Sequence, residues 1–159
     1  MTWSAHLTVA TVVERDGRFL LVEEHSRDAT FPVFNQPAGH VEMGETLIEA
    51  AIRETLEETA WQVEIRDILG LYSYTPPAFP ERTYYRVCFI AQALHDTQQA
   101  LDPDIIATHW LTLDELQQSG QARSPLVIQA IQDYLAGQRF PLALLNEQFL
   151  TPKPLLMES

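Results

Sequence analysis

The sequence predicts a single domain of the α/β sandwich class. Strand-like segments alternate along the chain with two or three helix-like segments, which is the pattern of helices packed on a sheet. The chain has 159 residues, enough for one complete hydrophobic core and too few for two. Its composition is 46% hydrophobic and 20% charged, as in ordinary globular proteins. We therefore treat residues 1–159 as one folding unit.

The N-terminal part of the chain reads as a β-hairpin. Residues 7–13 and 18–23 are rich in apolar and β-branched side chains, and Arg15-Asp16-Gly17 lies between them. An Asp-Gly pair between two such runs is typical of a tight hairpin turn. A loop that contains Pro32 follows, and it leads through residues 36–39 to a helical segment.

The rest of the chain predicts three more strands and two more helices. The strands are expected over residues 63–74, 83–94 and 105–111, and the helices over 113–118 and 125–136. Residues 75–80 contain three prolines and therefore break regular structure between the first two strands. Gly137 is a stop signal for the last helix. The tail after Phe140 contains three prolines, and we expect it to wrap the surface.

The first helix begins near Thr46, because Thr46 followed by Glu49 is a capping box. A mostly apolar stripe on this helix is expected to pack on the sheet; it consists of Ile48, Ile52, Thr55, Leu56 and Thr59. At roughly 100° per residue, Glu54, Glu57 and Glu58 fall within an arc of about 100° on another face.

This acidic face has two readings. A bare glutamate cluster is commonly a solvated helix surface, whereas clustered carboxylates repel one another unless a cation offsets the repulsion. Arg53 lies four residues before Glu57, within reach of its carboxylate. Oxygen-only ligands suit Mg²⁺ or Mn²⁺. We favour a metal site formed by Glu54, Glu57 and Glu58, and we expect Glu45 to support Arg53 and its loop.

The spacing resembles the Nudix box, G-x5-E-x7-R-E-U-x-E-E-x-G-U, in which U is a bulky apolar residue. The six glycine and charged positions match; they are Gly39, Glu45, Arg53, Glu54, Glu57 and Glu58. Thr55 replaces an apolar residue and Ala60 replaces the glycine that follows the helix. Alanine in a left-handed helix cap costs on the order of 1 kcal/mol. The departures concern the helix and its terminus, and they leave the carboxylates intact.

The resemblance implies an α/β/α sandwich around a mixed sheet, with the box at residues 39–61. It also implies a divalent cofactor, Mg²⁺ or Mn²⁺, and it adds the Gly39 carbonyl to the metal ligands. The catalytic residues we expect are Arg53, Glu54 and Glu57. Glu54 is our choice of general base. Some Nudix enzymes use an acid from a later loop, so three loop carboxylates stay open as alternatives: Glu81, Asp102 and Asp104.

A bound pyrophosphate needs recognition outside the metal site. Among the arginines (27, 82, 86 and 123), we choose Arg86 for phosphate contacts, because it alternates with apolar residues in a predicted strand; surface ion pairs are the default for Arg82 and Arg123. For contacts with the organic group we choose Phe34, Tyr74 and His40. Tyr72 and Tyr84 are further candidates, although aromatic residues in strands usually belong to the core.

Further segments resemble bacterial Nudix phosphatases; they are residues 6–10, 19–24, 35–40, 123–127 and 137–142. This resemblance implies metal-dependent release of orthophosphate from nucleoside tri- and diphosphates and from hydroxymethylpyrimidine or thiamine pyrophosphate. One alternative is a pyrophosphatase that acts on nucleotide sugars, ADP-ribose or oxidised nucleoside triphosphates and yields a nucleoside monophosphate. The other is a nucleotide-binding module without turnover.

Composition limits the partners. The net charge of −12 argues against a nucleic acid polymer, while small anionic substrates remain compatible because a bound metal reverses the local field. We expect no membrane span, since no apolar run approaches the ~18 residues required. Cys88 is the only cysteine and lies in an apolar run, so a buried side chain in a cytoplasmic protein is expected. The sequence leaves monomer and homodimer open.

Overall fold

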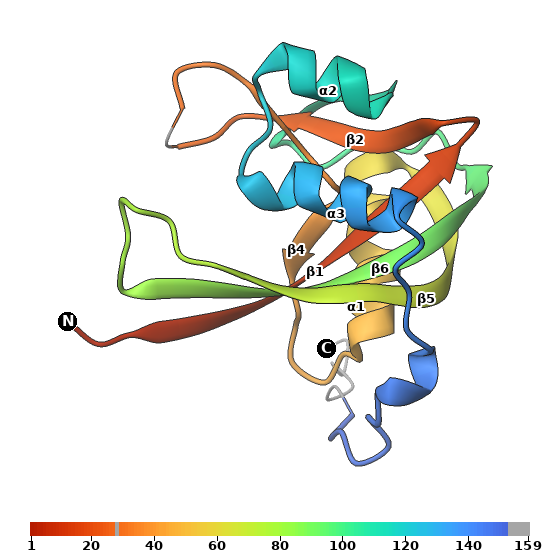
Figure 1. Cartoon of the computed structure of the whole chain (residues 1–159). Coiled ribbons are helices and arrows are strands. Elements are labelled where there is room, and N and C mark those ends of the chain that lie inside the picture. The colour runs from red at the N-terminus through yellow and green to blue at the C-terminus, as the bar shows by residue number, and fades with distance from the viewer. Residues whose placement is uncertain (28, 153–159) are drawn as a thin grey trace, which may run out of the picture.

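The computed structural model describes residues 1–27 and 29–152. Its elements follow the predicted order along the chain (Figure 1). They are β1 (Ser4–Arg15), β2 (Arg18–Glu24), β3 (Val33–Asn35), β4 (Ala38–His40), α1 (Leu47–Thr59), β5 (Trp61–Tyr74), β6 (Arg82–Asp96), β7 (Ile105–Leu111), α2 (Leu113–Ser119), α3 (Pro125–Leu135) and the 3₁₀ helix η1 (Leu142–Leu144).

The sheet is mixed, as the family resemblance implied. β1 runs parallel to β6, and β6 pairs with β5 in an antiparallel hairpin. The short strand β4 pairs with β1 in antiparallel fashion. β2 continues from β1 through the tight turn and carries β3 and β7, both antiparallel to it. Asp16 and Gly17 form that turn with φ values of 53° and 76°, which explains the Asp-Gly pair.

Helices cover both faces of this sheet. α1 lies on one face, where Ala50 and Ala51 pack against Val9 and Phe89 in one apolar cluster. α2 and α3 lie on the other face (Figure 1) and contribute a second cluster; it includes Leu116, Val127, Ala130 and Ile131, together with Leu21 and Cys88. The predicted α/β/α sandwich is therefore confirmed.

Cys88 is fully buried, and burial raises the pKa of its thiol to about 12. The side chain is therefore a small apolar core group and is unsuited to act as a nucleophile near neutral pH. The two shortest strands, β3 and β4, were missed by the sequence analysis. Three residues are too few to produce a periodic pattern, and their pairing depends on distant strands.

Helix α1 begins and ends as its sequence indicates. The Thr46 hydroxyl accepts a hydrogen bond from the Glu49 N–H at 3.0 Å. Ala60 adopts the left-handed conformation that a glycine would favour, with φ 65°. The predicted packing stripe was wrong in one member, because Ile52 is 36% exposed. The buried residues include the predicted Thr55 and Thr59, together with Ala50, Ala51 and Glu58, which the predicted stripe left out.

Thr55 replaces the apolar residue of the Nudix box without leaving a polar atom unpaired. Its hydroxyl donates to the Ala51 carbonyl at 2.7 Å. The Thr55 and Thr11 hydroxyl oxygens are 2.8 Å apart, and both side chains are fully buried. Since the single Thr55 hydrogen is used on Ala51, Thr11 must donate to Thr55. A hydroxyl pair thus joins α1 to β1 inside the core.

This pair can be tested by a double-mutant cycle with Thr55→Val and Thr11→Val. Thr55→Val leaves the buried Thr11 hydroxyl without an acceptor, so the free energy of unfolding should fall by about 1–3 kcal/mol. The double variant should recover much of that loss, because both polar groups are then removed. Denaturant unfolding curves measure all four proteins. Additive losses in the double variant would contradict the assignment.

Candidate metal and phosphate site

Arg53 organises the charged residues of the Nudix box. Its Nε and Nη2 atoms donate to the two oxygens of Glu45 at 2.6 and 2.9 Å. Nη1 donates to Glu54 at 2.8 Å and to Glu57 at 3.2 Å, and Nη2 also donates to the His40 carbonyl at 3.2 Å. The hydrogen bonds that Arg53 donates to Glu45 are the main reason that the Arg53 pKa is raised. One arginine therefore fixes carboxylates from both the loop and α1.

Three carboxylates converge beside this arginine. Oxygen atoms of Glu54, Glu57 and Asp102 all lie within 4.8 Å of one another. Asp102 belongs to the loop before β7, and its backbone N–H donates to the Glu57 carbonyl at 3.0 Å, which ties that loop to α1. The sequence analysis had considered Asp102 only as a general base. The structure places it next to the expected metal ligands Glu54 and Glu57.

Gly39, on β4, lies opposite Glu54 of α1. A Cβ atom at residue 39 would overlap the carboxylate group of Glu54, so the close approach of strand and helix requires glycine. The register pairs Gly39 with Val9 of β1, which fixes its distance from α1. The family resemblance implies that the Gly39 carbonyl is a metal ligand. What the structure shows is that the missing side chain of Gly39 leaves space for the Glu54 carboxylate.

Glu58 lies deeper than the other glutamates and outside the group of three. The residue is 8% exposed, and its carboxylate accepts a hydrogen bond from the Ala38 N–H at 2.7 Å. Burial raises the pKa of Glu58 to about 9, with further contributions from Glu24 and Glu54. Burial also raises the pKa of Glu54, against the opposing effect of Arg53. These pKa values are raised by desolvation and by neighbouring negative charge, both of which a bound cation would counteract.

The donor set fits a hard divalent cation. All the groups offered are carboxylate oxygens, three of them already converge, and Glu54 lies close enough to Glu58 to raise the pKa of Glu58. Softer metals prefer sulfur or imidazole ligands. Within the described part of the chain, this is the one group of three or more His, Cys, Asp or Glu side chains whose ligand atoms converge.

Arg86 is a partly buried cation close enough to Glu58 for the two charges to interact. The guanidinium of Arg86 donates to the Gln36 side chain at 3.4 Å and to the Asn35 side chain at 3.3 Å, and these bonds are long. Burial lowers the pKa of Arg86, while Glu24 and Glu58 favour its charged form. Among residues 1–27 and 29–152, Arg86 forms no ion pair. Its charge is thus available to an anion.

Arg123 is held nearby by a carboxylate that the sequence analysis missed. Arg123 forms an ion pair with Glu24, which also accepts a hydrogen bond from Asn35 at 3.3 Å. Surface pairing was expected for Arg123, and its side chain is 46% exposed, but its partner Glu24 is almost completely buried. Glu24 has no signal in the sequence that separates it from its neighbour Glu23. Only the pairing of β2 with β3 places it at the site.

The predicted contacts for an organic group are distributed over three places. His40 lies beside His6, with ring nitrogens 3.4 Å apart, and burial lowers the pKa of His40. Tyr74 lines a shallow cavity of about 350 Å³ between β5 and the α2–α3 connection, where Arg123 also lies. Phe34 packs edge-on against His109 at 5.4 Å.

The remaining candidates lie away from the acidic group. Tyr72 donates a hydrogen bond to Asp133 of α3 at 2.7 Å, so it is a packing residue. Tyr84 stacks beside His6 with ring centroids 5.1 Å apart. Arg82, the first residue of β6, forms an ion pair with its neighbour Glu81 at 3.6 Å, in agreement with the predicted surface pairing. Arg27 and Asp104 are exposed.

The fold and this arrangement are those of the Nudix hydrolases. The family model of the NUDIX domain matches residues 4–130, and the chain therefore belongs to the Nudix family. It is 37% identical over 144 residues to Phosphatase NudJ from Escherichia coli K12, covering 89% of this chain and 91% of that protein. The Shigella flexneri protein of the same name shows the same similarity. The chain is a Nudix hydrolase homologous to the phosphatase NudJ.

Solved structures of Nudix hydrolases have the same fold as this chain. A NUDIX hydrolase from Nitrosomonas europaea superposes with a TM-score of 0.84 at 41% identity, covering 90% of this chain and 97% of that one. A MutT NUDIX hydrolase from Burkholderia pseudomallei gives a TM-score of 0.69 at 23% identity, covering 82% and 98%, and this similarity concerns the fold. Nudix hydrolases generally use divalent metals. Over the described residues, no helix has the length and apolar character needed to cross a bilayer.

The raised pKa of Glu58 predicts an unusual pH dependence of stability in the metal-free protein. The folded-state pKa of about 9 lies above 4.5, the ordinary pKa of a glutamate side chain. Between these two pH values the folded state therefore holds a proton that the unfolded state has released. The stabilising contribution is complete below pH 4.5 and is lost as the pH rises toward 9. Glu58→Gln should flatten this decline by up to about 1.4 kcal/mol per pH unit and stabilise the metal-free protein at pH 8.

The measurement is denaturant unfolding from pH 5 to 9 in the presence of a chelator. Glu64→Gln, at an exposed position on β5, is the matched control for loss of one carboxylate. A Glu58→Gln profile parallel to those of the parent and the control would show that Glu58 is ionised in the folded protein.

Proposed function

We propose that this Nudix hydrolase uses Mg²⁺ to hydrolyse phosphoanhydride bonds in small organic pyrophosphates and releases orthophosphate. The substrate classes proposed are nucleoside tri- and diphosphates and hydroxymethylpyrimidine or thiamine pyrophosphate. The observation that carries the proposal is the convergence of Glu54, Glu57 and Asp102 beside Arg53. The similarity to proteins named Phosphatase NudJ supports orthophosphate as the product.

Glu54, Glu57 and Asp102 would hold the metal, with Glu58 and the Gly39 carbonyl as further oxygen donors. When bound, the cation neutralises phosphoryl charge and lowers the pKa of an attacking water. Mn²⁺ has the same preference for oxygen ligands and would substitute. Arg53 keeps the carboxylates in place before substrate arrives, so little reorganisation is required during the reaction.

The water must lose a proton to a nearby base. We assign this role to Glu54, which accepts a hydrogen bond from Arg53 through one oxygen and lies within the carboxylate group. Asp102 is the alternative, because the structure brings this loop acid to the same place. Comparison of the pH–rate profiles of Glu54→Gln and Asp102→Asn separates the two. The residue whose replacement removes the acidic limb is the base.

Arg86 would bind phosphate oxygens near Glu58. Its guanidinium carries a charge that no carboxylate of the described chain pairs with, and the two amides orient it. A local cation of this kind is needed in a protein whose net charge is −12. We propose that Tyr74, Phe34 and His40 contact the organic group, although they lie in three separate places.

A substrate panel incubated with Mg²⁺, with orthophosphate and pyrophosphate measured separately, tests the proposal. Orthophosphate release is expected. Nucleoside monophosphate from nucleotide sugars, ADP-ribose or oxidised nucleoside triphosphates would favour the alternative Nudix pyrophosphatase. Binding without any product would favour a nucleotide-binding module.

Glu57→Gln and Asp102→Asn should each lower kcat/KM by about 30-fold or more, equivalent to roughly 2 kcal/mol of lost transition-state stabilisation. Glu64→Gln provides the control, because it removes an exposed carboxylate on β5. Steady-state kinetics at saturating Mg²⁺ measure all four proteins. Parent-like rates in both site variants would refute the metal assignment.

A further inference from the structure

The segment that follows α3 lies outside the residues matched by the family model, which ends at residue 130. We call residues 138–150 the C-terminal strap. It is attached to β5 at its start: Gln138 donates to the Leu69 carbonyl at 2.9 Å, and Phe140 and Ile68 exchange two backbone hydrogen bonds at 2.7 and 2.9 Å. The strap therefore follows a fixed course after leaving α3.

The strap then crosses to the helix that carries the Nudix glutamates. Leu142 and Leu145 pack against the same apolar cluster as Leu47 and Ile48, the first two residues of α1. In Figure 1 this blue segment runs below α1, on the side of the loop that leads into the helix. Leu150 lines a cavity of about 460 Å³ together with Leu47. Apolar contacts thus bring the strap to the N-terminus of α1.

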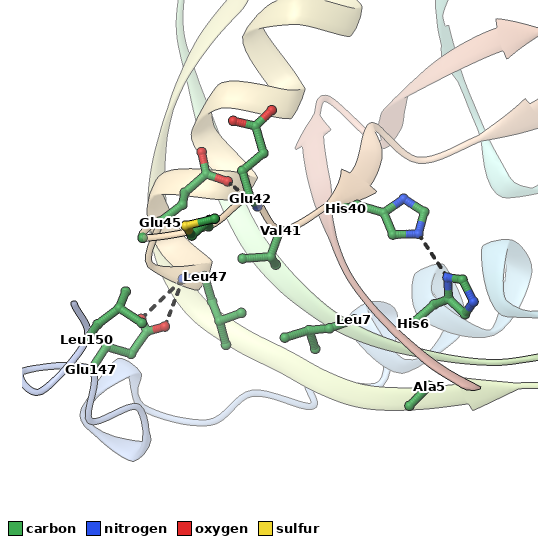
Figure 2. A pocket seen from close by; sticks show the side chains of 12 residues that line it. Ala5, His6, Leu7, His40, Val41, Glu42, Glu45, Leu47, Glu147 and Leu150 are labelled. Atoms are coloured by element: carbon green, nitrogen blue, oxygen red, sulfur yellow. Dashed lines mark hydrogen bonds between the residues drawn. The ribbon is translucent and has the colours of Figure 1, made fainter. Parts of the chain in front are cut away.

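One charged contact completes this junction. Both carboxylate oxygens of Glu147 accept the Leu47 N–H, at 2.9 and 3.2 Å (Figure 2). The Thr46 hydroxyl already accepts a hydrogen bond from the Glu49 N–H. Glu147 therefore pairs a different donor of the first turn, one that has no partner within the helix. A negative charge at this end also interacts favourably with the helix dipole.

The position of the contact connects it to the candidate site. Leu47 is two residues after Glu45, whose carboxylate holds Arg53 through two hydrogen bonds. The Glu45 N–H also donates to the Glu42 carbonyl at 3.2 Å, and the Glu42 N–H donates to the Glu45 carboxylate at 3.1 Å, so the loop before α1 is a compact turn. Glu147 binds at the joint between this turn and the helix.

We propose that Glu147 is a positioning residue for the carboxylate site. By holding the Leu47 N–H, it fixes the first turn of α1 relative to the Glu45 loop. This in turn fixes the Glu45–Arg53 contact and the orientation of Glu54 and Glu57. The consequence for catalysis rests on the proposed function, whereas the effects on helix order and cation binding do not.

The first test uses metal-free protein. Hydrogen exchange of the first-turn amides of α1 is compared among the parent, Glu147→Ala, Glu147→Gln and the charge-matched control Glu64→Ala. Glu147→Ala should accelerate exchange at Leu47 and in the Glu42–Glu45 turn by about tenfold or more. Glu147→Gln should be intermediate, because its amide oxygen still accepts one hydrogen bond without the charge. Parent-like exchange in Glu147→Ala would overturn the proposal.

The second test separates positioning from a general loss of stability. Mn²⁺ affinity is measured by electron paramagnetic resonance at a temperature where circular dichroism shows every variant folded. Glu147→Ala should weaken Mn²⁺ binding by about threefold or more relative to Glu64→Ala, with partial rescue in Glu147→Gln. Unchanged Mn²⁺ affinity in Glu147→Ala, even with a lower Tm, would overturn the positioning role.

These measurements do not need turnover. If the parent binds Mn²⁺ but hydrolyses no pyrophosphate, the proposed function fails while the role of Glu147 is still decided by the affinities. If the parent does hydrolyse its substrate, Glu147→Ala should raise the Mg²⁺ concentration for half-maximal activity and leave KM for the substrate nearly unchanged. A change in KM alone would contradict the proposal.

Discussion

The paired hydrogen bonds between Arg53 and Glu45 are the interaction on which the candidate site depends. Glu54, Glu57 and Asp102 lie close enough to repel one another, and partial burial of Glu54 adds to the cost of its charge. Because two of its nitrogens are fixed by Glu45, the guanidinium presents the third to Glu54 and Glu57 in one orientation. Lysine has no such planar fork and would not replace it.

Charged groups of both signs lie near the buried carboxylate of Glu58. Besides burial, Glu54 and Asp102 raise its pKa. Glu58 in turn favours the charged form of Arg86, and its carboxylate accepts a hydrogen bond from the Ala38 N–H of β4. Because burial raises the pKa of Glu58, an ionised carboxylate there is expected to cost stability in the absence of a cation. A site that is electrostatically unfavourable in the empty protein has more to gain from a cation. Function is thus supported at some expense of stability.

Local sequence signals were sufficient for α1 and for the order of the main elements. Thr46 and Glu49 act within one turn, and the spacing of Glu54 and Glu57 determines their common side whatever the tertiary fold. The failures concern contacts between segments distant in sequence. Ile52 was assigned to the packing face because helical periodicity does not reveal the angle at which α1 meets the sheet.

The same reason explains the site residues that were missed or misassigned. Asp102 and Glu24 resemble ordinary surface acids until β7 and β3 pair with β2 and bring them to the box. Thr55 reads as a poor substitute for an apolar residue until Thr11 is seen across from it. Glu147 is a hundred positions from its partner Leu47. Each of these contacts is decided by topology, which spacing along one element does not encode.

Anomalous diffraction at the manganese edge, from crystals soaked in Mn²⁺ near pH 7.5, tests the central claim most directly. The account predicts an anomalous peak at coordination distance from oxygens of Glu54 and Glu57, with the guanidinium of Arg53 still paired with Glu45. Ordered side chains around a position without any anomalous signal would contradict it.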